Sequence, residues 1–441
     1  RATDILDISA RVIRVLTGQA DVSLDAPSII IADDLTPSET VQMDKSKILG
    51  FVTVHGSTNS HTAILARMMN IPALVMTPVD LNALTTGMEA IVDGINGEVI
   101  IDPTEEVIKE ADVRIEAELE KRRMLEELKG QETVTKSGQH VHLYANIGSV
   151  EDVSYVLEND AEGIGLFRSE FLYLGRPDLP TEDEQFEAYK KVLTAMGDKK
   201  VIIRTLDIGA DKQADSLALD KEENPALGYR AIRICLTQPE VFKTQIRALL
   251  RAAVYGNLSV MYPMIISPWE VEKIKEIVTE VEAELKAAGI ACKMPEQGIM
   301  IETPASVMMA EELAQLVDFF SIGTNDLIQY TVAAERGNTK IANLYTKNHP
   351  AVIKLIQQTI DAAHNNGIFC GMCGEAASNI HYIPLLIGLG IDEFSMNFSA
   401  ILETKKIITH LERSKCEDLA KEVLMAISDK EVEEILKQFE Y

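Results

Sequence analysis

Three things are scarce in this sequence, and each scarcity excludes a class of protein. Five cysteines among 441 residues are too few, and odd in number, for a disulfide-stapled scaffold, so we expect a reducing, cytoplasmic setting. No stretch of about 18 apolar residues is present, which a membrane-spanning helix would need. Residues 1–16 carry charges throughout without a continuous apolar segment, so they lack the pattern of a signal peptide.

Positive charge is the third deficit. Lys and Arg number 42 and Asp and Glu 69, so the net charge is −27. Proteins that bind nucleic acid or dock on anionic lipid need a basic face. The composition therefore predicts neither nucleic acid nor a membrane as a partner, although a few arginines in one pocket can still bind a small anion.

The length predicts about two to four domains of ordinary size. The chain starts at Arg1, and residues 2–16 have the pattern of a helix already under way, so we expect a segment of a longer protein. Up to about residue 103, short apolar runs at 28–32, 50–54, 73–76 and 98–101 alternate with turn residues. Residues 105–129 are rich in Glu, Lys and Arg, with apolar residues mostly three or four apart, which predicts a solvated linker helix.

From about residue 132 onward, short β-type runs alternate with helix-type stretches. This alternation predicts a parallel sheet, and eight units over about 310 residues match a closed (β/α)₈ barrel, typically ~250 residues long. An open doubly wound sheet is the alternative. The eight runs are 140–147, 163–167, 201–206, 258–263, 298–301, 319–322, 368–371 and 393–396. Helices are expected between most of them, at 239–254, 268–288, 305–316, 351–365 and 382–388.

Charged and polar residues follow five of the eight runs, where a barrel of this kind places its catalytic side chains. They are Arg168, Glu170, Arg204, Asp207, Lys212, Glu302, Asn325, Asp326, Cys373 and Glu375. The cations suit a phosphate or carboxylate, and two carboxylates on a rigid rim suit Mg²⁺. The pattern indicates a site for a phosphorylated, carboxylated anion with Mg²⁺; a rim of ordinary salt bridges is the alternative.

A histidine in the first region is a candidate nucleophile. His61 follows the turn residues 56–60 and stands at the start of a helix expected to end near Met69. Free N–H groups at a helix N-terminus stabilise an incoming anion, and a neutral imidazole near pH 7 is a competent nucleophile. The alternative is that His61 caps its own helix.

Cys370 and Cys373 form a C-x-x-C pattern. A redox or zinc pair normally has a thioredoxin-type context or a second ligand pair, and the other three cysteines are isolated. Alternation along a strand and its exit separates the two thiols, with Cys370 inside the fold. Because a thiol of ordinary pKa is protonated at neutral pH, Cys373 is a candidate general acid.

Several motifs together resemble the phosphoenolpyruvate (PEP)-utilising enzymes. Residues 60–67 are similar to the phosphohistidine signature of that family. Within it, the chain resembles the Enzyme I group, the PEP–protein phosphotransferases of the bacterial sugar phosphotransferase system, over essentially its whole length. The other matching segments are 34–40, 163–171, 204–209, 224–233, 301–305, 321–326, 335–338 and 371–375.

The resemblance implies a fold and a set of roles. A swivelling phosphohistidine α/β domain would cover residues 1–103, a linker helix 104–131, and a PEP-binding (β/α)₈ barrel that forms a homodimer 132–441. His61 would be phosphorylated, with Thr40 orienting it, and Cys373 would protonate the enolpyruvate carbon. Glu302 and Asp326 would bind Mg²⁺. Arg168, Arg204, Asn325, Asp326 and Arg336 would hold PEP, supported by Arg230 and Lys212.

The implied reaction is Mg²⁺-dependent phosphoryl transfer from PEP to His61, giving pyruvate, and then, in the full-length protein, to the phosphocarrier HPr. It is the first step of sugar uptake by that system. Residues 56–59 depart from the usual Gly-Gly-Arg-Thr, which bears on how phosphate is cradled. The helical subdomain that docks HPr is absent except for what resembles its last helix, so weaker transfer to HPr is expected.

Two rival readings come from neighbouring classes. Pyruvate-phosphate dikinases and PEP synthases share the histidine domain and the barrel, but they carry an ATP-binding module that this chain does not offer. The segments 167–172 and 179–182 favour Enzyme I. The second rival is a non-catalytic paralogue that keeps the fold, and the intact barrel motifs argue against it.

Overall fold

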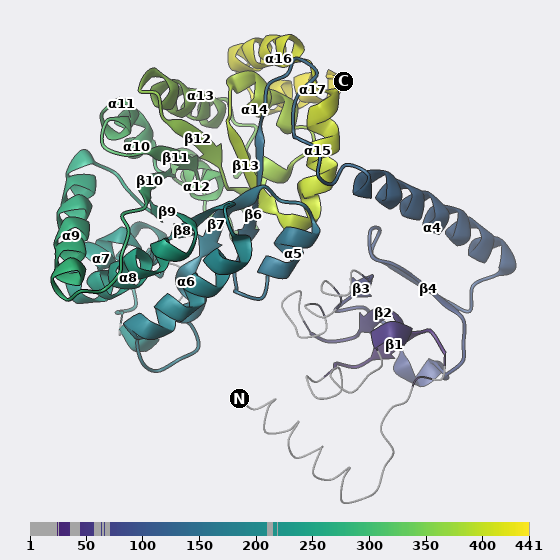
Figure 1. Cartoon of the computed structure of the whole chain (residues 1–441). Helices are drawn as coiled ribbons and strands as arrows, with labels where there is room; N and C mark the ends of the chain where they lie inside the picture. The colour runs from purple at the N-terminus through teal and green to yellow at the C-terminus, as the bar shows by residue number, and fades with distance from the viewer. Residues whose placement is uncertain are drawn as a thin grey trace, which may run out of the picture. The chain divides into compact units, whose positions relative to one another are not determined.

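The computed structural model describes residues 24, 26–35, 45–56, 63, 66, 71–209, 215–217 and 219–440. The chain separates into two compact units, Arg1–Arg123 and Met124–Tyr441. Each unit has a hydrophobic core of its own, and the second holds a closed strand barrel surrounded by helices (Figure 1).

The first unit contains a small parallel sheet and a hairpin. Strands β1 (Ser28–Ala32), β2 (Ile48–Thr53) and β3 (Ala73–Leu74) lie in that order, with Phe51 of β2 fully buried. Strands β4 (Ala90–Asp93) and β5 (Glu98–Ile101) pair antiparallel. Short 3₁₀ turns cover Lys45–Lys47 and Leu81–Ala83. Strand β4 was not predicted, because its apolar run of three residues is too short to stand out.

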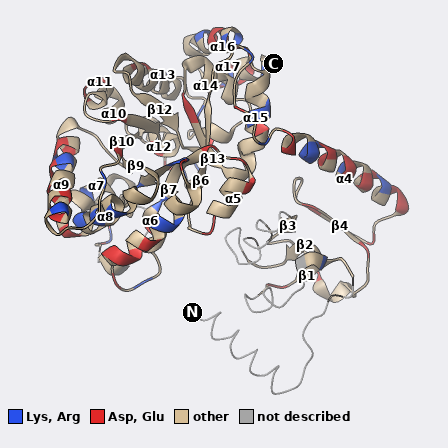
Figure 2. Ribbon diagram, in the orientation of Figure 1, with Lys and Arg blue, Asp and Glu red and all other residues tan. Residues whose placement is uncertain are grey.

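Helix α4 (Glu105–Glu126) alternates acidic and basic side chains along its length (Figure 2). Glu105 and Glu106 in its first turn match the positive end of the helix dipole. Ala111 is its buried residue, whereas Ile115 and Leu119 of the predicted stripe are more than half exposed. The helix is therefore largely solvated over its described length, and the predicted domain limits at 103 and 131 stay a prediction.

Eight parallel strands close the barrel of the second unit. In chain order they are β6 (His142–Ile147), β7 (Gly163–Arg168), β8 (Lys200–Arg204), β9 (Asn257–Tyr262), β10 (Glu296–Ile301), β11 (Phe319–Ile322), β12 (Phe369–Met372) and β13 (Glu393–Asn397). Each pairs with the next along the chain, and β13 pairs with β6 to complete the ring. The predicted closed barrel is confirmed, and the open doubly wound sheet was wrong.

Helices follow the strands and cover the outside of the barrel (Figure 1). They are α5 (Val153–Glu158), α6 (Glu182–Met196), α7 (Ile232–Thr237), α8 (Pro239–Ala252), α9 (Pro268–Ala287), α10 (Pro304–Met308), α11 (Ala310–Ala314), α12 (Thr324–Val332), α13 (Pro350–Asn365), α14 (Ile383–Leu389), α15 (Ile401–His410), α16 (Arg413–Met425) and α17 (Asp429–Gln438). The single helix expected over 305–316 is two helices. Met309 leaves helical dihedral angles between them, while the apolar spacing continues across the break.

Two apolar layers hold the barrel together. The larger lies between the strands and the helices. The smaller is supplied by consecutive strands and fills the interior: Leu166, Ile202, Met261, Met300, Phe319 and Cys373. A β-carbon on Gly298 would come within 2.5 Å of the Phe319 ring, so the interior has no spare space there. The barrel is thus a packed core, and its chemistry must lie at its ends.

Candidate active site

The carboxyl ends of the strands gather the predicted charged residues at one mouth of the barrel. Arg168 and Arg204 are the last residues of β7 and β8, and Glu302 directly follows β10. Asn325 and Asp326 lie in the first turn of α12, which follows β11, and Cys373 directly follows β12. Parallel strands of a closed barrel end at the same face, so these groups share one rim.

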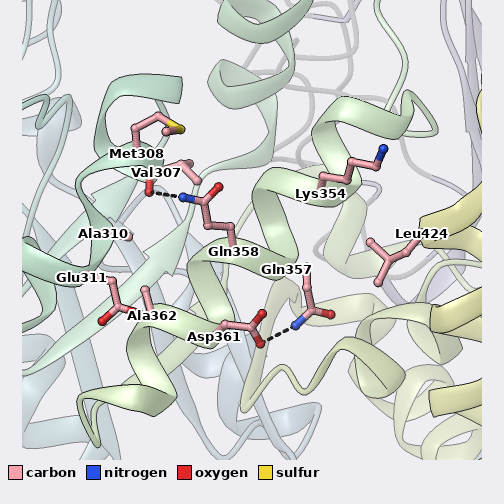
Figure 3. Close-up of a pocket in the computed structure, with 10 residues that line it drawn as sticks. All are labelled: Val307, Met308, Ala310, Glu311, Lys354, Gln357, Gln358, Asp361, Ala362 and Leu424. Carbon is pink, nitrogen blue, oxygen red and sulfur yellow. Dashed lines mark hydrogen bonds between the residues drawn. The ribbon is translucent and has the colours of Figure 1, made fainter.

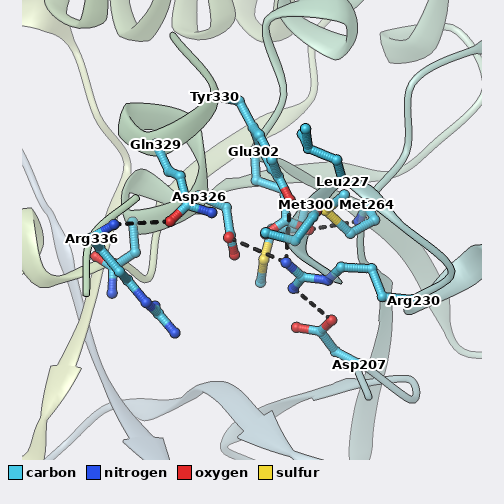
Figure 4. A network of polar contacts seen from close by, with 12 residues as sticks. Asp207, Leu227, Arg230, Met264, Met300, Glu302, Asp326, Gln329, Tyr330 and Arg336 are labelled. Atoms are coloured by element: carbon cyan, nitrogen blue, oxygen red, sulfur yellow. Dashed lines mark hydrogen bonds and ion pairs between the residues drawn. The ribbon is translucent and has the colours of Figure 1, made fainter. Parts of the chain in front are cut away.

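Two buried arginines, Arg204 and Arg230, are held by carboxylates in a connected network, and Figure 4 shows the part around Arg230. Arg204 pairs with Glu170, and its Nη1 lies 3.0 Å from Oδ2 of Asp207. Arg230 stands between two carboxylates, with Nη2 2.8 Å from Oδ1 of Asp207 and Nη1 3.3 Å from Oδ1 of Asp326. Burial by itself lowers the pKa of both guanidinium groups, but these carboxylates raise it above the usual value.

Two donors in this network have no hydrogen-bond partner among the described residues. They are the buried Nε atoms of Arg204 and Arg230. Arg168 is exposed, and no described carboxylate pairs with it. Desolvation in the rim and the positive charge of Arg204 lower the pKa of Arg168. Buried donors normally have partners, so the Nε groups of Arg204 and Arg230, together with the exposed cation of Arg168, are suited to a bound anion.

Backbone in unfavourable conformations shapes this rim. Ala231, directly after Arg230, has φ of 54°, and Met264 has φ of 59°. Such angles cost energy in a residue with a side chain and persist only where the surroundings enforce them. Gly209 has φ of 112°, and a β-carbon there would lie 2.4 Å from Cβ of Arg230. The loop after β8 therefore approaches Arg230 as closely as only glycine permits.

Glu302 and Asp326 are the predicted metal ligands. Glu302 is fully buried, and one oxygen accepts a hydrogen bond of 2.6 Å from the N–H of Met264. Burial raises the pKa of Glu302 to about 8, and the negative charges of Asp326 and Asp207 add to the rise. Two hard carboxylates that repel each other in a buried rim are the donor set that Mg²⁺ neutralises. The residues present therefore fit the ion.

The two cysteines of the C-x-x-C pattern lie in different layers. Cys370 belongs to the outer apolar layer, and Cys373 belongs to the interior layer. Both thiols are free. Burial raises the pKa of Cys373 to about 11, so the thiol keeps its proton near neutral pH. Cys373 can therefore donate a proton at the rim.

Asn325 and Arg336 complete the described part of the rim. The side chains of Asn325 and Glu375 are joined by a hydrogen bond of 3.2 Å, and the carbonyl of Asn325 accepts one of 3.0 Å from the hydroxyl of Tyr345. The N–H of Arg336 donates to Oε1 of Gln329 at 3.1 Å, as Figure 4 shows, and the Arg336 side chain is exposed.

Two rim residues were not singled out from the sequence. Tyr330 lies one helical turn after Asp326, and Arg230 donates to its hydroxyl at 3.3 Å. Asn146 in β6 donates to the carbonyls of Cys373 and Ser395 at 3.1 and 3.2 Å. Asn146 could have been found, since it stands near the end of the first barrel strand. Tyr330 carried no signal beyond its i, i+4 spacing from Asp326.

Three predicted site residues lie outside the described residues. They are His61, Thr40 and Lys212. Their predicted roles stay predictions.

A depression of about 320 Å³ lies elsewhere on the barrel, between α10, α11, α13 and α16 (Figure 3). Its lining residues are Val307, Met308, Ala310, Glu311, Lys354, Gln357, Gln358, Asp361, Ala362 and Leu424. It shares no residue with the rim and has no arginine in its lining. The rim is therefore the better candidate for anion chemistry.

Known families match both units. The family described as PEP-utilising enzyme, PEP-binding domain, matches residues 122–413, and the one described as PEP-utilising enzyme, mobile domain, matches residues 24–97. No helix in the described part of the chain has both the length and the apolar character to cross a membrane.

Curated relatives show which group of PEP-utilising enzymes the chain is similar to. The chain is 47% identical over 445 residues to a phosphoenolpyruvate-protein phosphotransferase of Bacillus subtilis, covering 99% of this chain and 78% of the relative. Relatives of the same name from Staphylococcus carnosus and Listeria innocua are each 46% identical, covering 100% of this chain and 77% of the relative.

The fold, the arginine-rich rim and these matches define a PEP-utilising enzyme. Within that class, the chain belongs to the phosphoenolpyruvate-protein phosphotransferase family, as the motifs predicted. The chain is therefore an enzyme of that family.

Proposed function

We propose that the barrel rim binds PEP with Mg²⁺ and that the phosphoryl group passes to His61 and then to HPr. The observation that carries this proposal is the set of three arginines at one rim, one without a described carboxylate partner and two with unpartnered buried Nε donors. Such groups match the phosphate and carboxylate of PEP through charge-assisted hydrogen bonds.

PEP would be held by residues from several strand ends. Arg168, Arg204 and Arg336 supply cations, Asn325 supplies an amide, and Asp326 joins substrate and metal. Arg230 supports Asp326, since it already pairs with that carboxylate. Lys212 is proposed as a further support.

Glu302 and Asp326 would hold Mg²⁺, as their oxygen donors and mutual repulsion favour. When bound, the ion neutralises charge on the phosphoryl oxygens and carboxylates. The protein's own residues orient PEP and exclude water: Glu302 is fully buried, and its Met264 contact fixes one oxygen.

The chemistry then needs one nucleophile and one acid. An imidazole nitrogen of His61, oriented by Thr40, attacks phosphorus. The bond from phosphorus to the enol oxygen breaks, and its electron pair stays on that oxygen as enolpyruvate. The Cys373 thiol gives its proton to the terminal carbon, which yields pyruvate, and the thiolate regains a proton from water. The raised pKa of Cys373 keeps that proton in place until the strongly basic carbon forms.

The proposal extends to partners and setting. We assign HPr as the acceptor of the phosphoryl group, a homodimer through the barrel, and a cytoplasmic location. Exposed apolar side chains on the barrel, at Met308, Met425 and Ile427, support a protein contact there. The five free thiols fit a reducing compartment.

The test of the function is transfer of labelled phosphate. The protein is incubated with PEP carrying ³²P and with Mg²⁺, and acid-labile phosphate is mapped by mass spectrometry. We expect one labelled histidine, His61, and weaker passage of the label to added HPr than from the full-length protein. His61→Ala should bind PEP near normally and take no label, because the rim is unchanged. Undiminished label on that variant would show that another residue is the acceptor.

A further inference from the structure

A second cluster of ligating side chains lies at the opposite ends of the barrel strands. His142 begins β6, His140 lies two residues before it, and Glu162 directly precedes β7. Each of the three offers one ligand atom, and these atoms lie within 4.8 Å of one another. The N-terminal ends of the strands form the face away from the rim, so this cluster is separate from the candidate active site.

The distances within the cluster match a metal polyhedron. Nδ1 of His142 lies 3.2 Å, and Nε2 of His140 3.5 Å, from the same oxygen, Oε2 of Glu162. A tetrahedral zinc ion with bonds of about 2.0–2.1 Å holds neighbouring ligand atoms roughly 3.3 Å apart. The imidazole rings stand at 71° to each other with centroids 4.5 Å apart, so both nitrogens approach the oxygen without stacking.

The surroundings hold the ligands in place. The hydroxyl of buried Thr133 donates to the other oxygen of Glu162 at 2.7 Å. The backbone N–H of Glu162 donates to the backbone carbonyl of Leu143 at 2.8 Å. The backbone N–H of His142 donates to the backbone carbonyl of Asp392 at 3.0 Å. His140 is fixed by a bridge to Val134. In metal sites, a carboxylate that binds the ion is usually held in place by a hydrogen bond to its other oxygen.

We propose that His140, His142 and Glu162 bind one divalent transition-metal ion, of the Zn²⁺ type, with a water in the fourth position. Two imidazoles and one carboxylate suit Zn²⁺ or Co²⁺ rather than Mg²⁺, which prefers oxygen ligands. The three side chains are between about one quarter and two fifths exposed, so an ion can enter and keep its water. The site joins the segment before β6 to the approach of β7, and its role is to stabilise that end of the barrel.

The test is titration of the whole metal-free chain with Co²⁺ and Zn²⁺. We expect one equivalent of Co²⁺ to give the visible absorption of a four-coordinate ion, and Zn²⁺ to displace it and raise the melting temperature. His140→Gln, His142→Gln and Glu162→Gln should each abolish that absorption. Thr133→Val should weaken binding about 10–100-fold, as loss of a supporting hydrogen bond does.

Two controls separate this site from others. His364→Gln removes a histidine that pairs with a single carboxylate, Asp392, at 3.0 Å, and should leave Co²⁺ binding intact. Asp326→Asn at the rim should also leave it intact, whatever it does to Mg²⁺. Circular dichroism verifies that each variant is folded. Co²⁺ absorption that survives in folded Glu162→Gln and His140→Gln, or no saturable binding by the parent chain, would overturn the proposal.

Discussion

Cys373 shows how one residue gains a role from the layer in which it is buried. Its side chain belongs to the same interior apolar cluster as Met300 and Met261, while Cys370 three residues earlier belongs to the outer layer. The side-chain amide of Asn146, in β6, donates to the Cys373 carbonyl, and the N–H of Cys373 donates to the carbonyl of Ile322 at 3.1 Å. Backbone held on two sides keeps the thiol at one position in the rim.

Replacement of Cys373 tests its role as the proton donor. Cys373→Ala should bind PEP normally and lose about 10²–10⁴-fold in pyruvate formation, which is the usual loss of a general acid. Because the pKa of this thiol is raised to about 11, ionisation of Cys373 should not limit the rate between pH 6 and 9. Deuterium incorporation at carbon 3 of pyruvate in D₂O gives the measurement.

The matched control is Cys370→Ala, which removes a buried thiol that does not face the rim. Cys370→Ala should reduce the rate of pyruvate formation far less than Cys373→Ala does. Stereospecific deuteration at a near-normal rate by Cys373→Ala would mean that another group protonates the carbon.

Glu302→Gln tests the metal site through two opposite effects. The amide can still accept from Met264, and it cannot become the buried negative charge that Glu302 acquires, beside Asp326 and Asp207, as the pH rises through its pKa of about 8. The metal-free protein should therefore become more stable, most of all above that pH, while affinity for Mn²⁺, used as a paramagnetic substitute for Mg²⁺, should fall at least tenfold. Thermal unfolding and electron paramagnetic resonance measure the two. Glu375→Gln is the control, because that carboxylate bonds to Asn325 and lies outside the pair; equal losses in both variants would place the metal elsewhere.

At the scale of elements, helix caps and side-chain hydrogen bonds between elements position the helices on the barrel. Thr181 and Glu184 form a capping box at the start of α6, and Ser267 and Glu270 form another at the start of α9. Between elements, Asp392 before β13 accepts from the N–H of Cys370 at 2.8 Å and from His364, in the last turn of α13, at 3.0 Å. One carboxylate thus ties α13 to two strands.

The His364–Asp392 contact predicts a pH-dependent contribution to stability. Its hydrogen bond raises the pKa of His364 above 6.5, so the folded protein binds this proton more tightly than the unfolded chain does. The contribution is fully present below pH 6.5 and is lost as pH rises through the raised pKa. Both groups are partly exposed, so it should amount to about 0.5 kcal/mol or less.

The measurement compares thermal unfolding of the parent chain and His364→Gln at pH 5.5 and 8.5. We expect a stability difference at pH 5.5 that shrinks at pH 8.5. His410→Gln, which removes a histidine whose ring nitrogen bonds to a backbone carbonyl, is the matched control. A difference that grew with pH would contradict the assigned direction.

For the whole molecule, the proposed reaction is divided between the two units. The described rim residues and the contacts among them all lie within Met124–Tyr441, and the large apolar core runs from Val141 to Leu436 within the same unit. The proposed nucleophile, His61, belongs to the other unit. We therefore expect binding of PEP and capture of its phosphoryl group to be separable.

A fragment covering residues 124–441 tests this division. It should fold, bind PEP in the presence of Mg²⁺ with a Kd close to that of the whole chain, and take no label from ³²P-PEP. Calorimetric titration and autoradiography give the two readouts, with circular dichroism to verify the fold. Loss of PEP binding by a folded fragment would mean that the first unit supplies part of the binding site.

The sequence alone determined the barrel and most of its rim. Parallel strands buried on both faces are short continuous apolar runs. For this reason each of the eight predicted runs begins and ends within two residues of the strand in the structure. The residues that follow a strand in such a barrel share one face whatever their neighbours, so Arg168, Arg204, Glu302, Asp326 and Cys373 could be chosen by position. The predicted charged linker agrees with α4.

Only the tertiary structure decided which of these groups meet. Asp207, Arg230 and Asp326 are joined although Arg230 and Asp326 are 96 residues apart, and no local pattern encodes that pairing. The same holds for Glu162, which reaches His140 and His142 because β6 and β7 lie side by side. Periodicity reports which face a residue takes within its own element. Which charges become partners, and how far burial moves their pKa, depends on ring closure, which brings distant segments into contact and removes water from between them.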